Sequence, residues 1–231
     1  MSTLSHQERP AAGPAEGLLV LHHGRGADDH DLLGLADALD PERRLHVVTP
    51  RAPLTLGGWP GYHWYVVPRV GHPEPQSFRA AYDRLAAFHD ELWARTGIGP
   101  ERTILGGFSM GAVMSYALGL PDGRPAPAGI LALSGFVPTV EGWQPDVASR
   151  AGRSRVFIAH GRRDPVIAVD FGRRARALLE AGGVAVEYHE SDAAHHVDPA
   201  QLPAAVAWIG ATLPPAGAAG APAGAGGEAP R

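Results

Sequence analysis

The chain contains the stretch Thr103-Ile104-Leu105-Gly106-Gly107-Phe108-Ser109-Met110-Gly111, in which an apolar run leads to a serine flanked by glycines. The apolar run predicts a buried strand, and the residues after the serine predict a helix. Gly107 and Gly111 lie two positions before and after Ser109, as a strand that turns sharply into a helix requires, because side chains there would collide. The stretch therefore predicts a Ser109 hydroxyl exposed at the carboxyl edge of a sheet. A plain glycine turn is the alternative, since the chain contains 30 glycines.

Strands and helices alternate along the rest of the chain, which predicts a mainly parallel sheet covered by helices on both faces. The predicted strands cover residues 18–22, 45–48, 103–107, 129–133, 156–160 and 184–188. The predicted helices cover residues 28–39, 76–96, 109–118, 168–181 and 200–213. We expect one domain over residues 17–213, a flexible segment over residues 1–16, and a disordered Ala/Gly/Pro-rich tail over residues 214–231.

A nucleophilic serine needs a base and an acid that orients the base. In enzymes that carry the serine on such a strand-to-helix turn, these partners follow along the chain in the order Ser, Asp or Glu, His. Asp164 lies in the loop that leaves the predicted strand 156–160, and we expect it to be the acid. His195 follows the last predicted strand, and we expect it to be the base. The alternatives are an Asp-Pro turn at Asp164 and an ordinary loop histidine at position 195, since the chain contains 12 histidines.

The loop after the first predicted strand carries His22-His23-Gly24-Arg25-Gly26 and can aim a backbone amide at the serine. Acyl transfer generates a negatively charged oxygen that fixed amides must stabilise, and we expect the N–H groups of Arg25 and Met110 to form this oxyanion hole. A metal site, a phosphate-binding loop and an ordinary turn are alternatives. A zinc site would need further ligands at short spacing, and a phosphate loop would need Gly-Lys-Ser/Thr, which this loop lacks. We therefore expect no metal and no cofactor.

These segments together resemble the phospholipase/carboxylesterase family, which includes bacterial carboxylesterases and acyl-protein thioesterases. The resemblance is carried by residues 21–32, residues 107–111, residues 133–136, His160-Gly161 with Asp164, and His195 ahead of Val197-Asp198-Pro199. It spans residues 17–213 and implies an α/β-hydrolase fold without a large lid domain.

The resemblance also ranks neighbouring histidines. Many relatives have a single His before the oxyanion-loop Gly, so His23 takes the family position and His22 is interpreted as a strand-end residue. The catalytic His of the family tends to lie two residues ahead of an aliphatic residue. This pattern selects His195 over His196, with Val197 as the marker.

Aromatic residues in two loops are candidates for the wall of a substrate pocket. Trp59 and Trp64 lie in a long excursion over residues 50–75, and Phe136 and Trp143 follow the predicted strand 129–133. Loops at the carboxyl ends of strands commonly determine specificity in this architecture. We therefore expect all four residues to bind substrate, although they would equally serve to pin the loops onto the body. Their apolar character favours an uncharged ester or thioester.

Composition excludes several functional classes. The net charge of -4 and the pI of about 6.3 give no basic footprint for nucleic acid. The absence of cysteine excludes disulfides and thiol nucleophiles. Residues 1–17 lack an apolar core of signal-peptide length, and no run of about 18 apolar residues occurs anywhere in the chain. We therefore expect a cytoplasmic protein without stable membrane insertion. A homodimer is compatible with the sequence.

The sequence thus predicts a serine carboxylesterase that hydrolyses small to medium apolar esters through an acyl-enzyme, with a small-molecule ester as its partner. An acyl-protein thioesterase or lysophospholipase with the same three catalytic residues is the alternative. A binding module without activity on the same fold is a third reading, and it would leave the filled catalytic positions unexplained.

Overall fold

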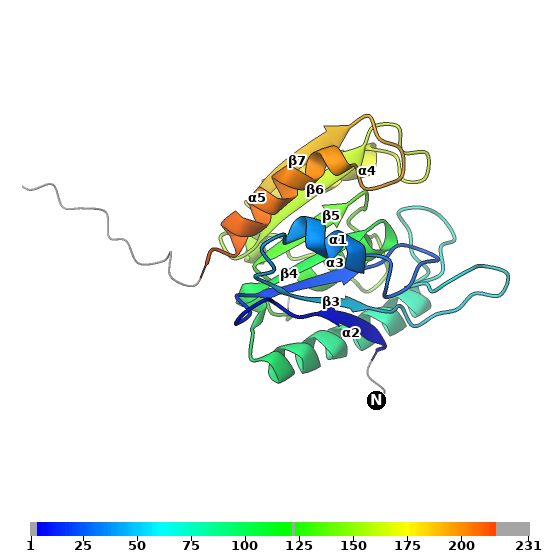
Figure 1. Ribbon diagram of the computed structural model, residues 1–231. Helices are drawn as coiled ribbons and strands as arrows, with labels where there is room; N and C mark the ends of the chain where they lie inside the picture. The colour runs from blue at the N-terminus through cyan, green and yellow to red at the C-terminus, as the bar shows by residue number, and fades with distance from the viewer. Residues whose placement is uncertain (1–3, 122, 216–231) are drawn as a thin grey trace, which may run out of the picture.

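The computed structural model describes residues 4–121 and 123–215, which form a seven-stranded sheet with helices on both faces (Figure 1). The strand order is β1-β3-β2-β4-β5-β6-β7. β1 pairs antiparallel with β3, and all other neighbouring strands are parallel. The strands are β1 His6–Arg9, β2 Leu18–His22, β3 His46–Pro50, β4 Thr103–Phe108, β5 Gly129–Leu133, β6 Arg155–Gly161 and β7 Ala185–Ser191. The predicted parallel α/β architecture is confirmed.

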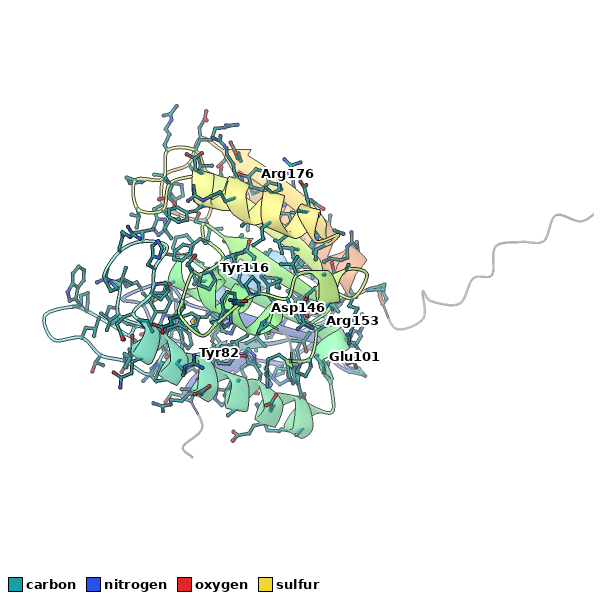
Figure 2. All side chains as sticks on the ribbon, turned by 180° about the vertical axis from the view of Figure 1, so that it is seen from behind. Tyr82, Glu101, Tyr116, Asp146, Arg153 and Arg176 are labelled. Carbon is teal, nitrogen blue, oxygen red and sulfur yellow. The ribbon has the colours of Figure 1, made fainter. Side chains whose placement is uncertain are left out.

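The helices of the described residues divide between the two faces of the sheet. They are α1 Leu33–Leu39, α2 Pro75–Thr96, α3 Met110–Gly119, α4 Asp170–Ala181 and α5 Leu202–Thr212, with short 3-10 helices at Pro100–Arg102, Ala148–Arg150 and Pro199–Gln201. α1 and α5 cover the face nearer the viewer in Figure 1. Figure 2 shows the opposite face, where Arg176 marks α4, Tyr116 marks α3 and Tyr82 marks α2. Each face has its own apolar core.

Strands β2 and β5 and helix α3 are buried along their whole length because other elements cover them on both sides. All five residues of β2 and of β5 are buried, as is every residue of α3. This pattern is typical of parallel strands with helices on both faces. The carboxyl ends of β2, β4, β5, β6 and β7 consequently meet at one edge of the sheet, where the loops predicted to carry the site begin.

Local chain chemistry sets the ends of α2, the longest helix. The Glu74 side chain accepts hydrogen bonds from the backbone N–H groups of Gln76 and Ser77, and Pro75 occupies the first turn. Gly97 ends the helix with a φ of 69°, a conformation that glycine adopts without steric cost. Among the described residues, no helix is both long and apolar enough to cross a bilayer.

The N-terminal segment differs from its prediction. We expected residues 1–16 to be flexible, and this is wrong for part of the described range, because His6–Arg9 form β1 and pair with β3. Leu4 is buried beside this strand. The polar sequence of β1 shows no apolar alternation, so its anchoring depends on partners distant in the sequence. The first helix is also shorter than predicted and begins at Leu33. The predicted disordered tail lies, from residue 216 onward, outside the described residues.

Candidate active site

Ser109 lies at the turn between β4 and α3 in a backbone conformation that side chains rarely adopt, with φ 54° and ψ −118°. Its N–H donates a hydrogen bond to the Leu133 carbonyl at 2.9 Å. A Cβ atom at Gly107 would lie 2.5 Å from the backbone of Gly111, and one at Gly111 would collide with the His22 carbonyl. The two glycines therefore allow the turn, and the surrounding backbone maintains the strain at Ser109.

The structure brings Ser109, His195 and Asp164 into one hydrogen-bonded chain. His195 Nε2 lies 2.9 Å from Ser109 Oγ, and His195 Nδ1 lies 2.6 Å from Asp164 Oδ2. The other carboxylate oxygen, Oδ1, accepts hydrogen bonds from the N–H groups of Val166 and Ile167, each at 2.8 Å. Because a carboxylate only accepts, His195 Nδ1 donates to Asp164, and Nε2 is left to accept the serine proton.

Two residues to which the sequence analysis gave no role support this chain. His160, in β6, donates from Nε2 to the Ile167 carbonyl at 2.8 Å and so fixes the loop that holds Asp164. Burial lowers the pKa of His160, which favours the neutral ring. The Phe108 ring packs against the His195 ring with centroids 4.9 Å apart. The sequence contained one signal for such a role, because both residues lie at the ends of strands near predicted catalytic residues.

The loop after β2 is held in place by the His23 ring. His23 donates from Nδ1 to the Gly24 carbonyl at 2.7 Å, and its Nε2 accepts the Ala52 N–H at 3.0 Å. Burial lowers the pKa of His23, consistent with a neutral ring that donates from one nitrogen and accepts at the other. The Gly24 carbonyl and the Arg25 N–H belong to one trans peptide unit and point in opposite directions. The His23 ring thereby orients the Arg25 amide.

A cavity of about 420 Å³ opens at Ser109. Gly24, Arg25, Met110 and His195 share its wall with the serine. Met110 is the first residue of α3, where the backbone N–H has no acceptor within the helix. The apolar side chains of the wall are those of Ala27, Tyr65, Val67, Val70, Phe108, Phe136, Val166 and Ile167. The charged side chains are those of Arg25, Asp31 and Arg69.

Of the four aromatic residues expected to bind substrate, Phe136 lines this cavity and the three tryptophans do not. Trp59 is 57% exposed and packs under the Arg25 guanidinium at 4.2 Å. Trp64 is fully buried, and its indole N–H donates to the His23 carbonyl at 2.9 Å. Trp143 donates to the Ala117 carbonyl at 3.1 Å and lines a neighbouring groove. The expectation is corrected for Trp59 and Trp64, which stabilise loops, and Trp143 lines the neighbouring groove instead of this cavity.

The buried histidines do not gather into a metal site. Among the described residues, one group of three donors lies within 4.8 Å, formed by Asp28, Asp29 and His30. The Asp29 carboxylate of this group already accepts hydrogen bonds from Gln7 and Arg51. His22, the other member of the histidine pair, lies in β2 and contacts His89 of α2 at 3.2 Å. This contact is one imidazole bonding to another, without a gap between them for an ion.

Comparison with known proteins identifies the family to which the chain belongs. Residues 8–213 match the profile of the phospholipase/carboxylesterase family. Acyl-protein thioesterase 1 of Debaryomyces hansenii is 28% identical over 195 residues, which cover 77% of this chain and 83% of that protein.

Solved structures of esterases share the fold. The crystal structure of esterase PE8 has a TM-score of 0.75 and 31% sequence identity, and the match covers 92% of this chain and 100% of that one. The Bacillus cereus carboxylesterase has a TM-score of 0.79 and 25% identity, with 90% and 94% of the two chains covered. The chain is therefore a serine hydrolase that acts on ester bonds, and it belongs to the phospholipase/carboxylesterase family.

Proposed function

We propose that this chain is a carboxylesterase that hydrolyses small to medium apolar carboxylic esters through an acyl-enzyme on Ser109. The observation that carries the proposal is the hydrogen-bonded chain from Asp164 through His195 to Ser109, which ends in a largely apolar cavity of about 420 Å³. This volume lies within the range of roughly 300–1,000 Å³ that is common for small-molecule sites.

In the proposed first half-reaction, Ser109 Oγ attacks the ester carbonyl while its proton moves to His195 Nε2. Asp164 holds the ring in the tautomer that accepts this proton and stabilises the imidazolium that forms. The N–H groups of Arg25 and Met110 donate hydrogen bonds to the negatively charged oxygen of the tetrahedral intermediate. The imidazolium then gives its proton to the departing alkoxide, so that the alcohol leaves and the acyl group remains on Ser109.

In the second half-reaction, a water molecule replaces the alcohol. His195 Nε2 removes a proton from the water as it attacks the acyl carbonyl, and the same two amides stabilise the second tetrahedral intermediate. Return of the proton from His195 to Ser109 Oγ releases the carboxylic acid. Every proton in the cycle passes through one imidazole, so the cycle requires no ion or cofactor.

An acyl-protein thioesterase is the second candidate. The similarity to the Debaryomyces hansenii protein of that name favours it, and a thioester carbonyl would use the same residues. The two candidates differ in leaving group and in the size of the partner. The absence of a lid domain from the described residues favours a small soluble ester over a substrate held at a lipid interface.

The test is a panel of p-nitrophenyl esters with acyl chains from acetate to laurate, compared with an acyl thioester of matched chain length. We expect the highest kcat/KM on short and medium esters, with no loss in EDTA. A kcat/KM that favours the thioester at every chain length would replace the first candidate by the second. Failure to turn over any ester or thioester would reject both.

A further inference from the structure

A second, larger cavity lies directly beside the active-site cavity. It is a groove of about 750 Å³ whose wall includes Val140, Trp143, Phe171 and Leu178. Phe136 lines both the groove and the cavity that contains Ser109. Its side chain is only 5% exposed, so the ring is enclosed between the two spaces. Phe136 thus forms part of the wall of both spaces, and it takes no part in the proposed acyl transfer.

This wall is packed against a second aromatic ring. The Phe136 ring lies 5.2 Å from the ring of Phe171 in α4, measured between centroids. A Cβ atom at Gly71 would lie 2.8 Å from Phe171 Cε1, so the backbone of the 50–75 excursion closes on that ring from one side. The Arg174 guanidinium lies 4.4 Å from the Phe171 ring centroid. The two packed phenylalanine rings therefore form a wall between the groove and the active-site cavity, which we call the partition.

The arrangement of the two apolar cores indicates whether the acyl part or the alcohol part of the ester contacts this partition. Phe108 and Val197, which flank His195 in space and in sequence, pack with the core on the α1–α5 face of the sheet. Phe136 and Phe171 pack with the core on the α2–α3–α4 face. Since His195 must protonate the departing alkoxide, the alcohol lies on the His195 side of Ser109. The acyl chain then extends to the opposite side, toward Phe136.

We propose that Phe136, backed by Phe171, determines acyl-chain length: it closes the acyl side of the cavity, and beyond it the groove is an apolar extension that a longer chain would occupy. The proposal rests on the proposed esterase function. It makes two separate claims, that the Phe136 ring blocks long acyl chains and that the space beyond it is the groove bounded by Leu178.

The test of the first claim is the ratio of kcat/KM for p-nitrophenyl laurate to that for p-nitrophenyl butyrate. We expect Phe136→Ala to raise this ratio by about tenfold or more, because several methylenes gain an apolar contact that the ring excludes. Phe136→Leu keeps more of the buried volume and is expected to raise the ratio less, in the same direction. It serves as the deciding variant if Phe136→Ala fails to fold, as judged by circular dichroism and a thermal melt.

The test of the second claim uses Leu178, which is 42% exposed on α4 and lines the groove but not the active-site cavity. In the Phe136→Ala protein, adding Leu178→Gln places a polar amide along the path of the long chain and should reverse most of the gain on laurate. Arg176→Gln is the matched control: Arg176 is exposed on the same helix and lines neither the groove nor the active-site cavity, so this substitution should leave the hydrolysis of both esters unchanged.

An unchanged laurate-to-butyrate ratio in both folded Phe136 variants would overturn the proposal. The proposal would also be overturned if the ratio rises in Phe136→Ala and does not fall again when Leu178→Gln is added, because the long acyl chain would then lie outside the groove. Either result would leave the proposed function standing as long as the wild-type protein hydrolyses butyrate. A wild-type protein without any esterase activity would instead reject the proposed function.

Discussion

At the residue scale, the assignment of the catalytic base rests on one side chain with both ring nitrogens engaged. His195 bridges Ser109 and Asp164, whereas its neighbour His196 is exposed and its backbone N–H bonds to the Ala194 carbonyl. Adjacent residues in this loop therefore face different surroundings. The imidazole at position 195 is the one that reaches the serine.

We expect His195→Ala to lower kcat by about 10⁴-fold to 10⁶-fold, the size of effect known for removal of a member of such a catalytic chain. His196→Ala is the matched control and should stay within a few-fold of the wild type. Steady-state kinetics on p-nitrophenyl butyrate measures both. The reverse ranking would transfer the role of base to His196.

A second prediction concerns the orientation of the oxyanion amide. His23→Ala removes the ring that holds the Gly24 carbonyl, so the Arg25 N–H loses its fixed direction. Loss of one oxyanion donor costs about 10² to 10³ in kcat, and misorientation of a donor should cost a part of this, about tenfold to hundredfold. KM should change much less.

Arg25→Ala is the control for this prediction, because it removes the side chain and keeps the backbone donor. It should be mild in kcat. A larger loss of kcat in Arg25→Ala than in His23→Ala would show that the guanidinium, and not the amide, is the group that matters.

At the element scale, β2, α2 and α3 are joined behind the catalytic serine by a buried chain of polar side chains. The Ser115 hydroxyl donates to the Gly111 carbonyl at 3.0 Å and lies 2.9 Å from His22 Nδ1. His22 Nδ1 therefore donates to the hydroxyl, and its Nε2 accepts from His89 Nε2. A hydrogen bond between the two Nε2 atoms requires one of them to lack a proton, so the two rings are not both charged.

Burial lowers the pKa of His89 to about 3, helped by the charge of Arg124, and burial lowers the pKa of His22 well below its ordinary value. An unfolded histidine has a pKa of about 6.5, so the unfolded chain binds more protons than the folded one below that pH. The stability that the neutral rings confer is therefore complete above pH 6.5 and falls as the pH drops toward 3.

We expect His89→Gln to weaken this pH dependence. The amide can still donate to His22 but does not titrate, so between pH 6 and 5 the slope of the unfolding free energy should fall by about 1 kcal/mol per pH unit. Urea denaturation at pH 7, 6 and 5 gives the slope. The same slope in the variant and the wild type would show that His89 is not held neutral by the fold.

The turn at Ser109 could be predicted from the sequence, whereas the wall of the pocket could not. The turn at Ser109 is encoded locally, because Gly107 and Gly111 are required by the backbone within a few residues. The pocket wall is not encoded locally. Trp64 does not line the cavity, and its indole N–H donates to the His23 carbonyl, a partner 41 residues away in the sequence.

At the scale of the whole molecule, one edge of the sheet is formed by β1, a strand that the sequence pattern did not predict. The Arg9 side chain at the end of β1 is buried and pairs with the buried carboxylate of Asp40 and with Asp37. Both partners lie about thirty residues away in the sequence, which is why a polar tetrapeptide becomes an ordered strand. The alternating strands and helices, in contrast, were sufficient to predict the parallel part of the sheet.

We expect Arg9→Met to destabilise the protein by about 3 kcal/mol, because it leaves the Asp40 carboxylate buried without its cation. The kcat/KM at 25 °C should not change, since Arg9 does not line the active-site cavity. Arg155→Met is the control: Arg155 is exposed and its guanidinium donates to the Ala211 carbonyl, so loss of this side chain should cost at most about 0.5 kcal/mol. Equal effects of the two substitutions in chemical denaturation would contradict the role given to β1.

The central claim is that Ser109 is the nucleophile, and covalent labelling tests it most directly. A fluorophosphonate, which reacts with an activated serine, should inactivate the wild-type protein and add one label, which mass spectrometry of the digested protein should locate on Ser109. Ser109→Ala should fold normally, take up no label, and lose about 10⁴-fold to 10⁶-fold in kcat. A label on another residue, or a Ser109→Ala protein that keeps near-normal activity, would contradict the account.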